Sequence, residues 1–261
     1  MSFANVNGQH IYFEDSGGNG AAVIFSHGFL MDHEMFAAQV AALAGEFRCI
    51  TWDERGFGET PAAEEFSYWD STDDALALLS HLGIDRAFFV GMSQGGFISL
   101  RAALVAPERV LGLGLIDTQS GCEDPNVQPV YDAMTEDWTT NGPSDDLAAA
   151  VASVIMSPGY DHSPWIAKWQ ARPKEFIKVP YRTLADRDDI SDRLPEITAP
   201  AIVFHGEADT AIPMEKAEQL QKELAGCEEL VRIPGAGHAS NLSHPAAVNG
   251  PLAAFLRRHA G

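Results

Sequence analysis

Short apolar runs alternate with longer amphipathic segments along most of this chain. The runs are too short for typical helices, which indicates strands buried on both faces of a sheet. Predicted strands lie within 10–18, 21–28, 48–60, 86–91, 110–117, 200–209 and 228–235. Predicted helices, with apolar residues at helical spacing, lie within 33–47, 68–83, 94–108, 213–226 and 245–259. This alternation predicts an α/β fold with a mostly parallel sheet between layers of helices.

One interval breaks the alternation. Residues 119–195 are rich in proline and tryptophan and contain short helical patches but no convincing buried strand. We interpret this interval as a mostly helical insertion into a core formed by 1–118 and 196–261.

The composition and charge narrow the class of protein. The 261 residues are 46% hydrophobic and 21% charged, which is enough apolar material for a large core. The formal charge of −20 argues against binding to nucleic acid phosphates or to an anionic membrane surface.

Cysteine usage and the N-terminus bear on the cellular compartment. The three cysteines are widely spaced and form no CxxC pair, as is typical of reduced thiols. The first residues lack the features of a secretion signal, and no apolar run approaches the length of a membrane span. A cytoplasmic protein is therefore expected, and its sequence is compatible with a homo-oligomer.

A serine stands at the junction of a predicted strand and a predicted helix. Gly91-Met92-Ser93-Gln94-Gly95 matches G-x-S-x-G, a strand–turn–helix motif that exposes a nucleophilic serine. The small residues on either side allow a tight turn, and the amides at the start of the helix favour nearby negative charge. The alternative is a structural turn with an idle serine.

A nucleophilic serine needs a base, and the chain has nine histidines. His238 follows the predicted strand within 228–235 in a glycine-lined loop, where catalytic groups of open α/β sheets gather. His244 competes with it. Its place beside Pro245, at the start of the last helix, is more natural for a capping or surface residue.

The base needs a carboxylate that fixes its tautomer. Asp209 and Glu207 both follow the next-to-last predicted strand, and Asp209 is favoured because it lies farther into the loop. Asp117, at the end of the predicted strand within 110–117, could also reach the histidine and is a genuine rival.

An acyl-transfer site also needs donors for the oxyanion. The N–H of Gln94, directly after the serine, is one candidate, and the N–H of Phe29, after the predicted strand within 21–28, is the other. His27 and Gly28 would shape that loop, although a simple turn at the end of a strand explains them too.

Five segments of the chain resemble the α/β-hydrolase superfamily and occur in the family's order. They are SHGFLMDHEMF (26–36), WDERGFGET (52–60), GMSQGG (91–96), FHGEADTAIP (204–213) and GAGHASNLSHP (235–245). The resemblance is greatest to small bacterial carboxylesterases, enol-lactonases of the beta-ketoadipate type and cofactor-free haloperoxidases. It implies an α/β-hydrolase fold with about eight strands in the sheet and a helical cap at 119–195.

The resemblance also implies roles for individual residues. Ser93, Asp209 and His238 would form the catalytic triad, and the amides of Phe29 and Gln94 the oxyanion hole. Two departures from the family's patterns matter. Carbon–carbon bond hydrolases usually carry asparagine before the serine and tryptophan after the histidine, where this chain has Met92 and Ala239. Haloalkane dehalogenases and epoxide hydrolases use an aspartate nucleophile, so Ser93 argues against both.

The predicted cap would determine which substrate enters. Trp165 and Trp169 are four residues apart and would share one face of a helix. Packing within the cap is the alternative explanation for them. The predicted pocket residues are Leu30, Met92, Trp138, Trp165 and Trp169, with Met134 and Met156 as further candidates.

These observations predict hydrolysis of a small to medium, apolar carboxylic ester or lactone through an acyl-enzyme, with this small molecule as the partner. Perhydrolase or haloperoxidase chemistry with the same triad, carbon–carbon bond hydrolysis and a non-catalytic ligand receptor are the alternatives. The sequence has no metal cluster, Walker loop or dinucleotide fingerprint, so no cofactor or metal is expected. The turn Asp53-Glu54-Arg55-Gly56 is interpreted as architectural.

Overall fold

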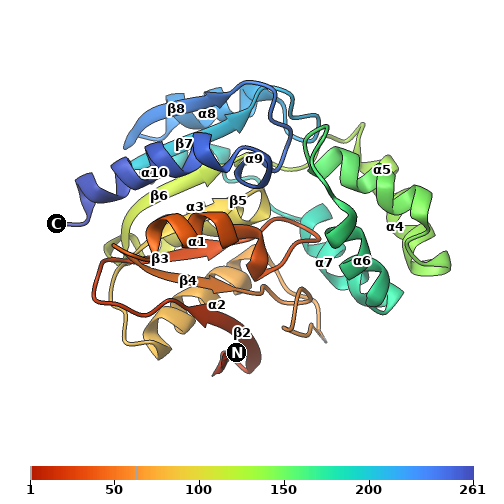
Figure 1. Ribbon diagram of the computed structural model, residues 1–261, viewed down its shortest axis with the longest axis horizontal. Coiled ribbons are helices and arrows are strands. Elements are labelled where there is room, and N and C mark those ends of the chain that lie inside the picture. Colours follow the sequence, from red (N-terminus) through yellow and green to blue (C-terminus); the bar gives the residue numbers. More distant parts are fainter. Residues whose placement is uncertain (1, 63) are drawn as a thin grey trace.

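A single eight-stranded sheet forms the centre of the molecule (Figure 1). The computed structural model describes residues 2–62 and 64–261. The strand order is β1-β2-β4-β3-β5-β6-β7-β8, with β1 and β2 antiparallel to their neighbours and all other pairs parallel. The strands are β1 (Ser2–Val6), β2 (Gln9–Asp15), β3 (Ala22–Ser26), β4 (Arg48–Trp52), β5 (Ala87–Met92), β6 (Val110–Ile116), β7 (Ala201–Gly206) and β8 (Cys227–Ile233). The predicted mostly parallel sheet is confirmed.

The first strand was not among the strands expected from the sequence. β1 pairs with β2 as a hairpin in which Val6 lies opposite Gln9. Asn7 and Gly8 form the turn with φ of 49° and 75°. An Asn-Gly pair between two strands is a strong hairpin signal, because both turn residues need positive φ. That signal could have revealed β1.

Helices cover both faces of the sheet (Figure 1). Helices α1 (Ala37–Leu43) and α10 (Pro245–His259) contribute to the apolar cluster on one face, and α2 (Tyr68–His81), α3 (Gln94–Val105) and α8 (Met214–Glu223) to the cluster on the other. Residues of β5 alternate between the clusters: Phe88 and Val90 join the first, whereas Ala87 and Phe89 join the second. This alternation follows from the two-residue period of a strand.

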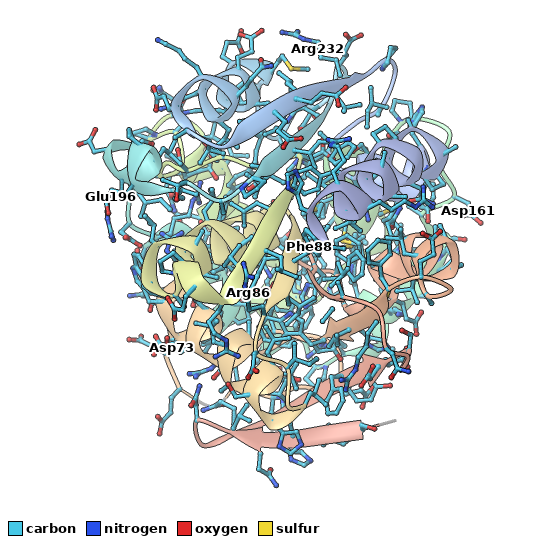
Figure 2. The ribbon with its side chains drawn as sticks, turned by 90° about the vertical axis from the view of Figure 1, so that its left-hand side faces the viewer. Asp73, Arg86, Phe88, Asp161, Glu196 and Arg232 are labelled. Carbon is cyan, nitrogen blue, oxygen red and sulfur yellow. The ribbon has the colours of Figure 1, made fainter. Side chains whose placement is uncertain are left out.

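Several charged side chains lie at the outside of the molecule. Figure 2 shows Phe88 within the molecule, whereas Asp73, Asp161 and Glu196 lie at its outside. None of the helices in 2–62 and 64–261 combines the length and the apolar character needed to cross a membrane.

Four helices lie together at one side of the sheet (Figure 1). They are α4 (Gln128–Asn141), α5 (Asp145–Ile155), α6 (Ser163–Ala171) and α7 (Lys178–Ala185), with short 3-10 helices at Lys174–Ile177 and Ser191–Glu196. A further short helix, α9 (Ser240–Ser243), precedes α10. The described residues of 119–195 include no strand. The division of the chain into a core and a cap at 118 and 196 stays a prediction.

Candidate active site

Ser93 lies on a tight turn between β5 and α3. Its backbone has φ 52° and ψ −116°, a conformation rarely adopted by a residue with a side chain. The two flanking glycines make this turn possible. A Cβ atom on Gly91 would lie 2.0 Å from the carbonyl oxygen of Gly95, and one on Gly95 would lie 1.9 Å from that of Ser26. The spacing of the motif therefore follows from backbone contacts.

The structure brings Ser93 together with His238 and Asp209. Nε2 of His238 lies 3.0 Å from Oγ of Ser93, and Nδ1 lies 2.8 Å from Oδ2 of Asp209. The other carboxylate oxygen of Asp209 accepts hydrogen bonds from the N–H groups of Ala211 and Ile212, at 2.8 and 2.9 Å. With its Nδ1 proton directed at the carboxylate, His238 presents Nε2 to the serine hydroxyl as an acceptor.

Burial and charge act in opposite directions on this pair. Burial disfavours the imidazolium form of His238, but the charge and hydrogen bond of Asp209 outweigh that effect and raise the pKa of His238. Burial acts to raise the pKa of Asp209, yet the nearby His238 lowers it overall. The arrangement therefore favours an ionised Asp209 that stabilises positive charge on His238.

Asp117, the rival acid, has other partners. Its Oδ1 accepts a hydrogen bond from Gly206 N, and its Oδ2 accepts one from Ser240 N, both at 2.8 Å. Asp117 thus joins the end of β7 to the start of α9. Burial, reinforced by the charge of Asp209, raises the pKa of Asp117 to about 7. The other two alternatives have different surroundings: Glu207 is exposed, and Nδ1 of His244 lies 2.9 Å from Oγ of Ser243.

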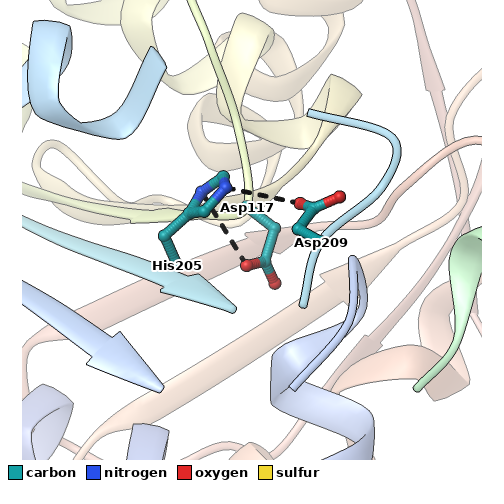
Figure 3. Close-up of side chains that lie close together, drawn as sticks. All are labelled: Asp117, His205 and Asp209. Atoms are coloured by element: carbon teal, nitrogen blue, oxygen red, sulfur yellow. Dashed lines mark ion pairs between the residues drawn. The ribbon is translucent and has the colours of Figure 1, made fainter. Parts of the chain in front are cut away.

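Asp117, His205 and Asp209 lie close enough together to suggest a metal site (Figure 3). Nδ1 of His205 is 4.0 Å from Asp117, and its Nε2 is 3.5 Å from Asp209. However, Nε2 of His205 bonds to the carbonyl of Ile212 at 2.9 Å, and every carboxylate oxygen of the two aspartates already accepts a hydrogen bond. These hydrogen bonds account for the close approach of the three side chains, and Nδ1 of His205 has no hydrogen-bond partner among the described residues.

The loop after β3 carries Phe29. Its turn is closed by a 3.1 Å hydrogen bond from Met31 N to the carbonyl of Gly28, with Leu30 at a φ of 65°. Within the described residues, neither Phe29 N nor Gln94 N donates a hydrogen bond. Gln94 is the first residue of α3, where amides have no acceptor inside the helix. Both N–H groups are thus free to bind an oxyanion.

A cavity of about 340 Å³ opens over Ser93 and His238. Leu30, Met92 and Met134 line it, as the sequence predicted, and Phe29 also contributes. The other residues that line the cavity were not among the predicted pocket residues. They are Gly28, Phe97, Gln119, Glu123, Val130, Tyr131, Leu147, Ala150, Val151, Val154, Ile155, Tyr181, Leu184, Arg187, Ala211 and Ile212. The helical spacing of Leu147, Val151 and Val154 could have revealed one face of α5.

The three tryptophans expected in the pocket do not line the cavity, so that expectation was wrong. Trp138, Trp165 and Trp169 are 0%, 7% and 2% exposed within the main apolar cluster. The rings of Trp138 and Trp169 lie 6.1 Å apart, and Lys168 covers the ring of Trp165 at 4.7 Å. Met156 is also buried and lies outside the cavity lining. Packing among α4, α5 and α6 accounts for these large side chains.

Part of the cavity wall is polar. Nη2 of Arg187 lies 3.5 Å from Oε2 of Glu123, and Nε donates a 3.0 Å hydrogen bond to the carbonyl of Gly121. The guanidinium lies 4.8 Å from the centre of the Phe97 ring. Gln119 also lines the cavity. The remaining wall is mostly apolar, so the site combines a large apolar surface with a few polar groups, as is typical of small-molecule sites.

Comparisons with known proteins agree with this architecture. Residues 21–142 match the family model described as alpha/beta hydrolase fold, and 167–260 match one described as TAP-like protein. The chain is 26% identical to 3-oxoadipate enol-lactonase 1 of Acinetobacter baylyi, over 87% of this chain and 85% of the relative. It is 30% identical to a Mycobacterium tuberculosis protein whose name, non-heme bromoperoxidase, is provisional, over 83% of this chain and 85% of the relative.

The overall fold is also similar to that of a solved structure. A thermophilic esterase from Thermogutta terrifontis superposes with a TM-score of 0.87 at 28% identity, covering 98% of this chain and 96% of that protein. Together with the matched family model and the eight-stranded sheet, these similarities show that the chain belongs to the α/β-hydrolase family.

Proposed function

We propose that this protein is a serine hydrolase that cleaves a carboxylic ester or lactone through an acyl-enzyme. The observation that carries the proposal is the hydrogen-bonded network that joins Ser93 to His238 and His238 to Asp209. In this network Ser93 lines a mostly apolar cavity. Such a network supplies a nucleophile, a base and a group that orients the base.

The first half of the reaction forms the acyl-enzyme. Oγ of Ser93 attacks the substrate carbonyl carbon while its proton passes to Nε2 of His238. The carbonyl electron pair moves to oxygen, and the amides of Phe29 and Gln94 stabilise the resulting oxyanion. When the tetrahedral intermediate collapses, the bond to the leaving oxygen breaks and His238 gives that oxygen its proton.

The second half restores the enzyme. A water molecule transfers one proton to His238 as its oxygen attacks the acyl carbon. Collapse of the second tetrahedral intermediate breaks the bond to Oγ, which takes the proton back from His238. Asp209 stays ionised and stabilises the imidazolium in both halves.

The cavity supports a small to medium, mainly apolar substrate. Its walls include Met134 from α4, with Leu147 and Val151 from α5. The polar part of the wall at Gln119 and Arg187 suits a hydrogen-bonding group elsewhere on the substrate. Relatives named as an enol-lactonase and an esterase support lactones and esters as the substrate class.

Perhydrolysis by the same triad is a second candidate, favoured by the relative with the bromoperoxidase name. Hydrogen peroxide would replace water as the nucleophile toward the acyl-serine, giving a peracid. Halogenation that depends on both an organic acid and peroxide would identify this activity.

The decisive experiment compares wild type with Ser93→Ala on a panel of 4-nitrophenyl esters, lactones and amides. We expect wild type to hydrolyse some of the esters or lactones, with a mass increase at Ser93 when the acyl-enzyme is trapped, and the variant to lose this turnover. Ester turnover near the wild-type rate in Ser93→Ala would refute the proposal.

A further inference from the structure

Glu54 makes direct contacts with both segments that carry the candidate oxyanion donors, the loop after β3 and the start of α3. It follows β4, and its side chain is fully buried. Its backbone N–H donates a 3.1 Å hydrogen bond to Nε2 of His27. Its carboxyl oxygen Oε2 accepts a 2.9 Å hydrogen bond from Nε2 of Gln94. One residue therefore links the loop after β3 to the first residue of α3.

The contact with His27 fixes the direction of the Phe29 amide. Because Nε2 of His27 accepts the bond from Glu54, the ring proton is on Nδ1, which donates to the carbonyl of Gly28 at 2.8 Å. Burial lowers the pKa of His27 and so favours this neutral form. In a trans peptide the C=O and N–H groups point in opposite directions. Holding the Gly28 carbonyl therefore also holds the N–H of Phe29.

The contact with Gln94 acts on the second donor. The Gln94 side chain is 1% exposed and lies between two partners: its Nε2 donates to Glu54, and its Oε1 accepts a 3.2 Å hydrogen bond from the Tyr68 hydroxyl. A side chain held at both ends restricts the backbone that carries it. The backbone N–H of Gln94 is the oxyanion donor at the start of α3.

The surroundings of Glu54 favour its neutral form. Among the described residues its Oε1 has no hydrogen-bond partner, and the preceding residue, Asp53, is a second buried acid. An ionised carboxylate without a compensating partner is costly in such a site. Burial raises the pKa of Glu54 well above its usual range, and Asp53 raises it further, against the opposing effect of the bond from Gln94. A neutral carboxyl can still accept the hydrogen bond from Gln94.

We propose that Glu54 is a positioning residue that holds both oxyanion donors in place, Phe29 through His27 and Gln94 through its side chain. This inference rests on the proposed acyl-transfer function. It gives a specific role to a turn that the sequence analysis interpreted as architectural, because this turn places one residue in hydrogen-bonding contact with both the loop after β3 and the start of α3.

The test uses two substitutions that change the side-chain contact with Gln94, whereas the backbone N–H of Glu54 that bonds to His27 is present in both. Glu54→Gln keeps a carbonyl acceptor for Gln94, whereas Glu54→Leu removes it. Loss of an oxyanion donor outright costs about 10²–10³ in rate, so we expect displacement of the donor in Glu54→Leu to lower kcat about tenfold or more. KM should change little, because the donors bind the transition state more strongly than the ground state. Glu54→Gln should retain most of the wild-type kcat.

A second readout reports the oxyanion directly. A trifluoromethyl ketone reacts with the nucleophilic serine to form a tetrahedral adduct, and this adduct carries the oxyanion. The affinity of the inhibitor should therefore fall in Glu54→Leu in parallel with kcat, and it should return to near the wild-type value in Glu54→Gln. Asp74→Asn is the matched control, since it alters a buried carboxylate that pairs with Arg55 without contacting His27 or Gln94. It should change thermal stability but leave the inhibitor's affinity intact.

Several results would overturn the positioning role of the Glu54 side chain. One is a Glu54→Leu protein with unchanged kcat and inhibitor affinity, and another is a Glu54→Gln protein as impaired as Glu54→Leu. If Glu54→Leu does not fold, Gln94→Leu removes the same hydrogen bond from the other partner while keeping the backbone N–H, and unchanged kcat there has the same meaning. Labelling by a fluorophosphonate distinguishes failure of the proposed function from failure of the role proposed for Glu54. Absence of label on Ser93 in wild type overturns the proposed function as well, whereas labelled Ser93 with unaffected variants overturns only the role of Glu54.

Discussion

The indole N–H of Trp169 donates a 2.7 Å hydrogen bond to the carbonyl of Leu30. Trp169 belongs to α6, in the segment predicted to be the cap, whereas Leu30 follows the candidate oxyanion donor Phe29. The predicted cap is therefore joined to the oxyanion loop by a buried hydrogen bond, and a residue expected to contact substrate instead contacts backbone.

Trp169→Phe should lower kcat several-fold with little change in KM, because the Leu30 carbonyl loses its donor and the loop gains freedom. The lost hydrogen bond should also cost about 1 kcal/mol of the free energy of unfolding. Steady-state kinetics and urea denaturation measure the two effects. Trp165→Phe is the control, since its indole donates to no described residue. Equal losses of kcat in both variants would contradict the role of the bond.

The pH dependence of turnover should report the contact between His238 and Asp209. Only neutral His238 can accept the serine proton, so kcat/KM should fall as the pH drops through the pKa of His238. Because that pKa is raised, the midpoint should lie above the ordinary value of about 6.5.

Asp209→Asn should move that midpoint to lower pH, because the imidazolium loses its anionic partner. It should also lower kcat by about 10⁴, as expected when the base loses the group that holds its tautomer. A pH–rate profile of both proteins measures the shift. An unchanged midpoint in Asp209→Asn would show that another group controls the acidic limb.

Asp117→Asn tests whether Asp117, rather than Asp209, is the acid that pairs with His238. An amide keeps one acceptor oxygen, so either Gly206 N or Ser240 N loses its partner, which should cost about 1–3 kcal/mol of the free energy of unfolding. Activity should fall less than about tenfold at temperatures where the variant is folded. Denaturation curves and kinetics should be measured together. Loss of activity comparable to that of Asp209→Asn, with unchanged stability, would assign Asp117 to the triad.

Val151→Trp should shorten the range of acyl chains that the enzyme accepts. Val151 lines the cavity and is 8% exposed, so an indole there fills space that a longer chain would occupy. We expect kcat/KM to fall about tenfold or more for 4-nitrophenyl octanoate and to change little for the acetate. Val105→Trp, at a position on α3 that is 48% exposed, is the matched control. A proportional loss for both esters would place the substrate elsewhere.

Local patterns in the sequence were sufficient for most of the fold. The apolar runs of β3, β5 and β7 are buried along their whole length, and such strands have few alternatives to the centre of a sheet. β1 was missed because it is mostly exposed and its apolar alternation is short, although the Asn7-Gly8 turn marks its end.

The sequence by itself was sufficient to single out Ser93 as the proposed nucleophile and His238 as the proposed base. The turn at Ser93 depends on glycines two residues away, and His238 lies in a loop that follows a strand, so both signals are local. The choice between Asp209 and Asp117 was decided only by the tertiary structure. Both acids follow parallel strands at the same edge of the sheet, and the direction of a carboxylate depends on which amides surround it.

The tertiary structure also decided the cavity and the role proposed for Glu54. A helical pattern shows which residues are apolar, but the face that packs on other helices and the face that lines a cavity have the same composition. Trp138 and Trp169 pack inward, whereas Val151 lines the cavity. Glu54, His27 and Gln94 are far apart in sequence and meet because β4, β3 and β5 are neighbouring strands. Such long-range hydrogen bonds leave no periodic signal in a single chain.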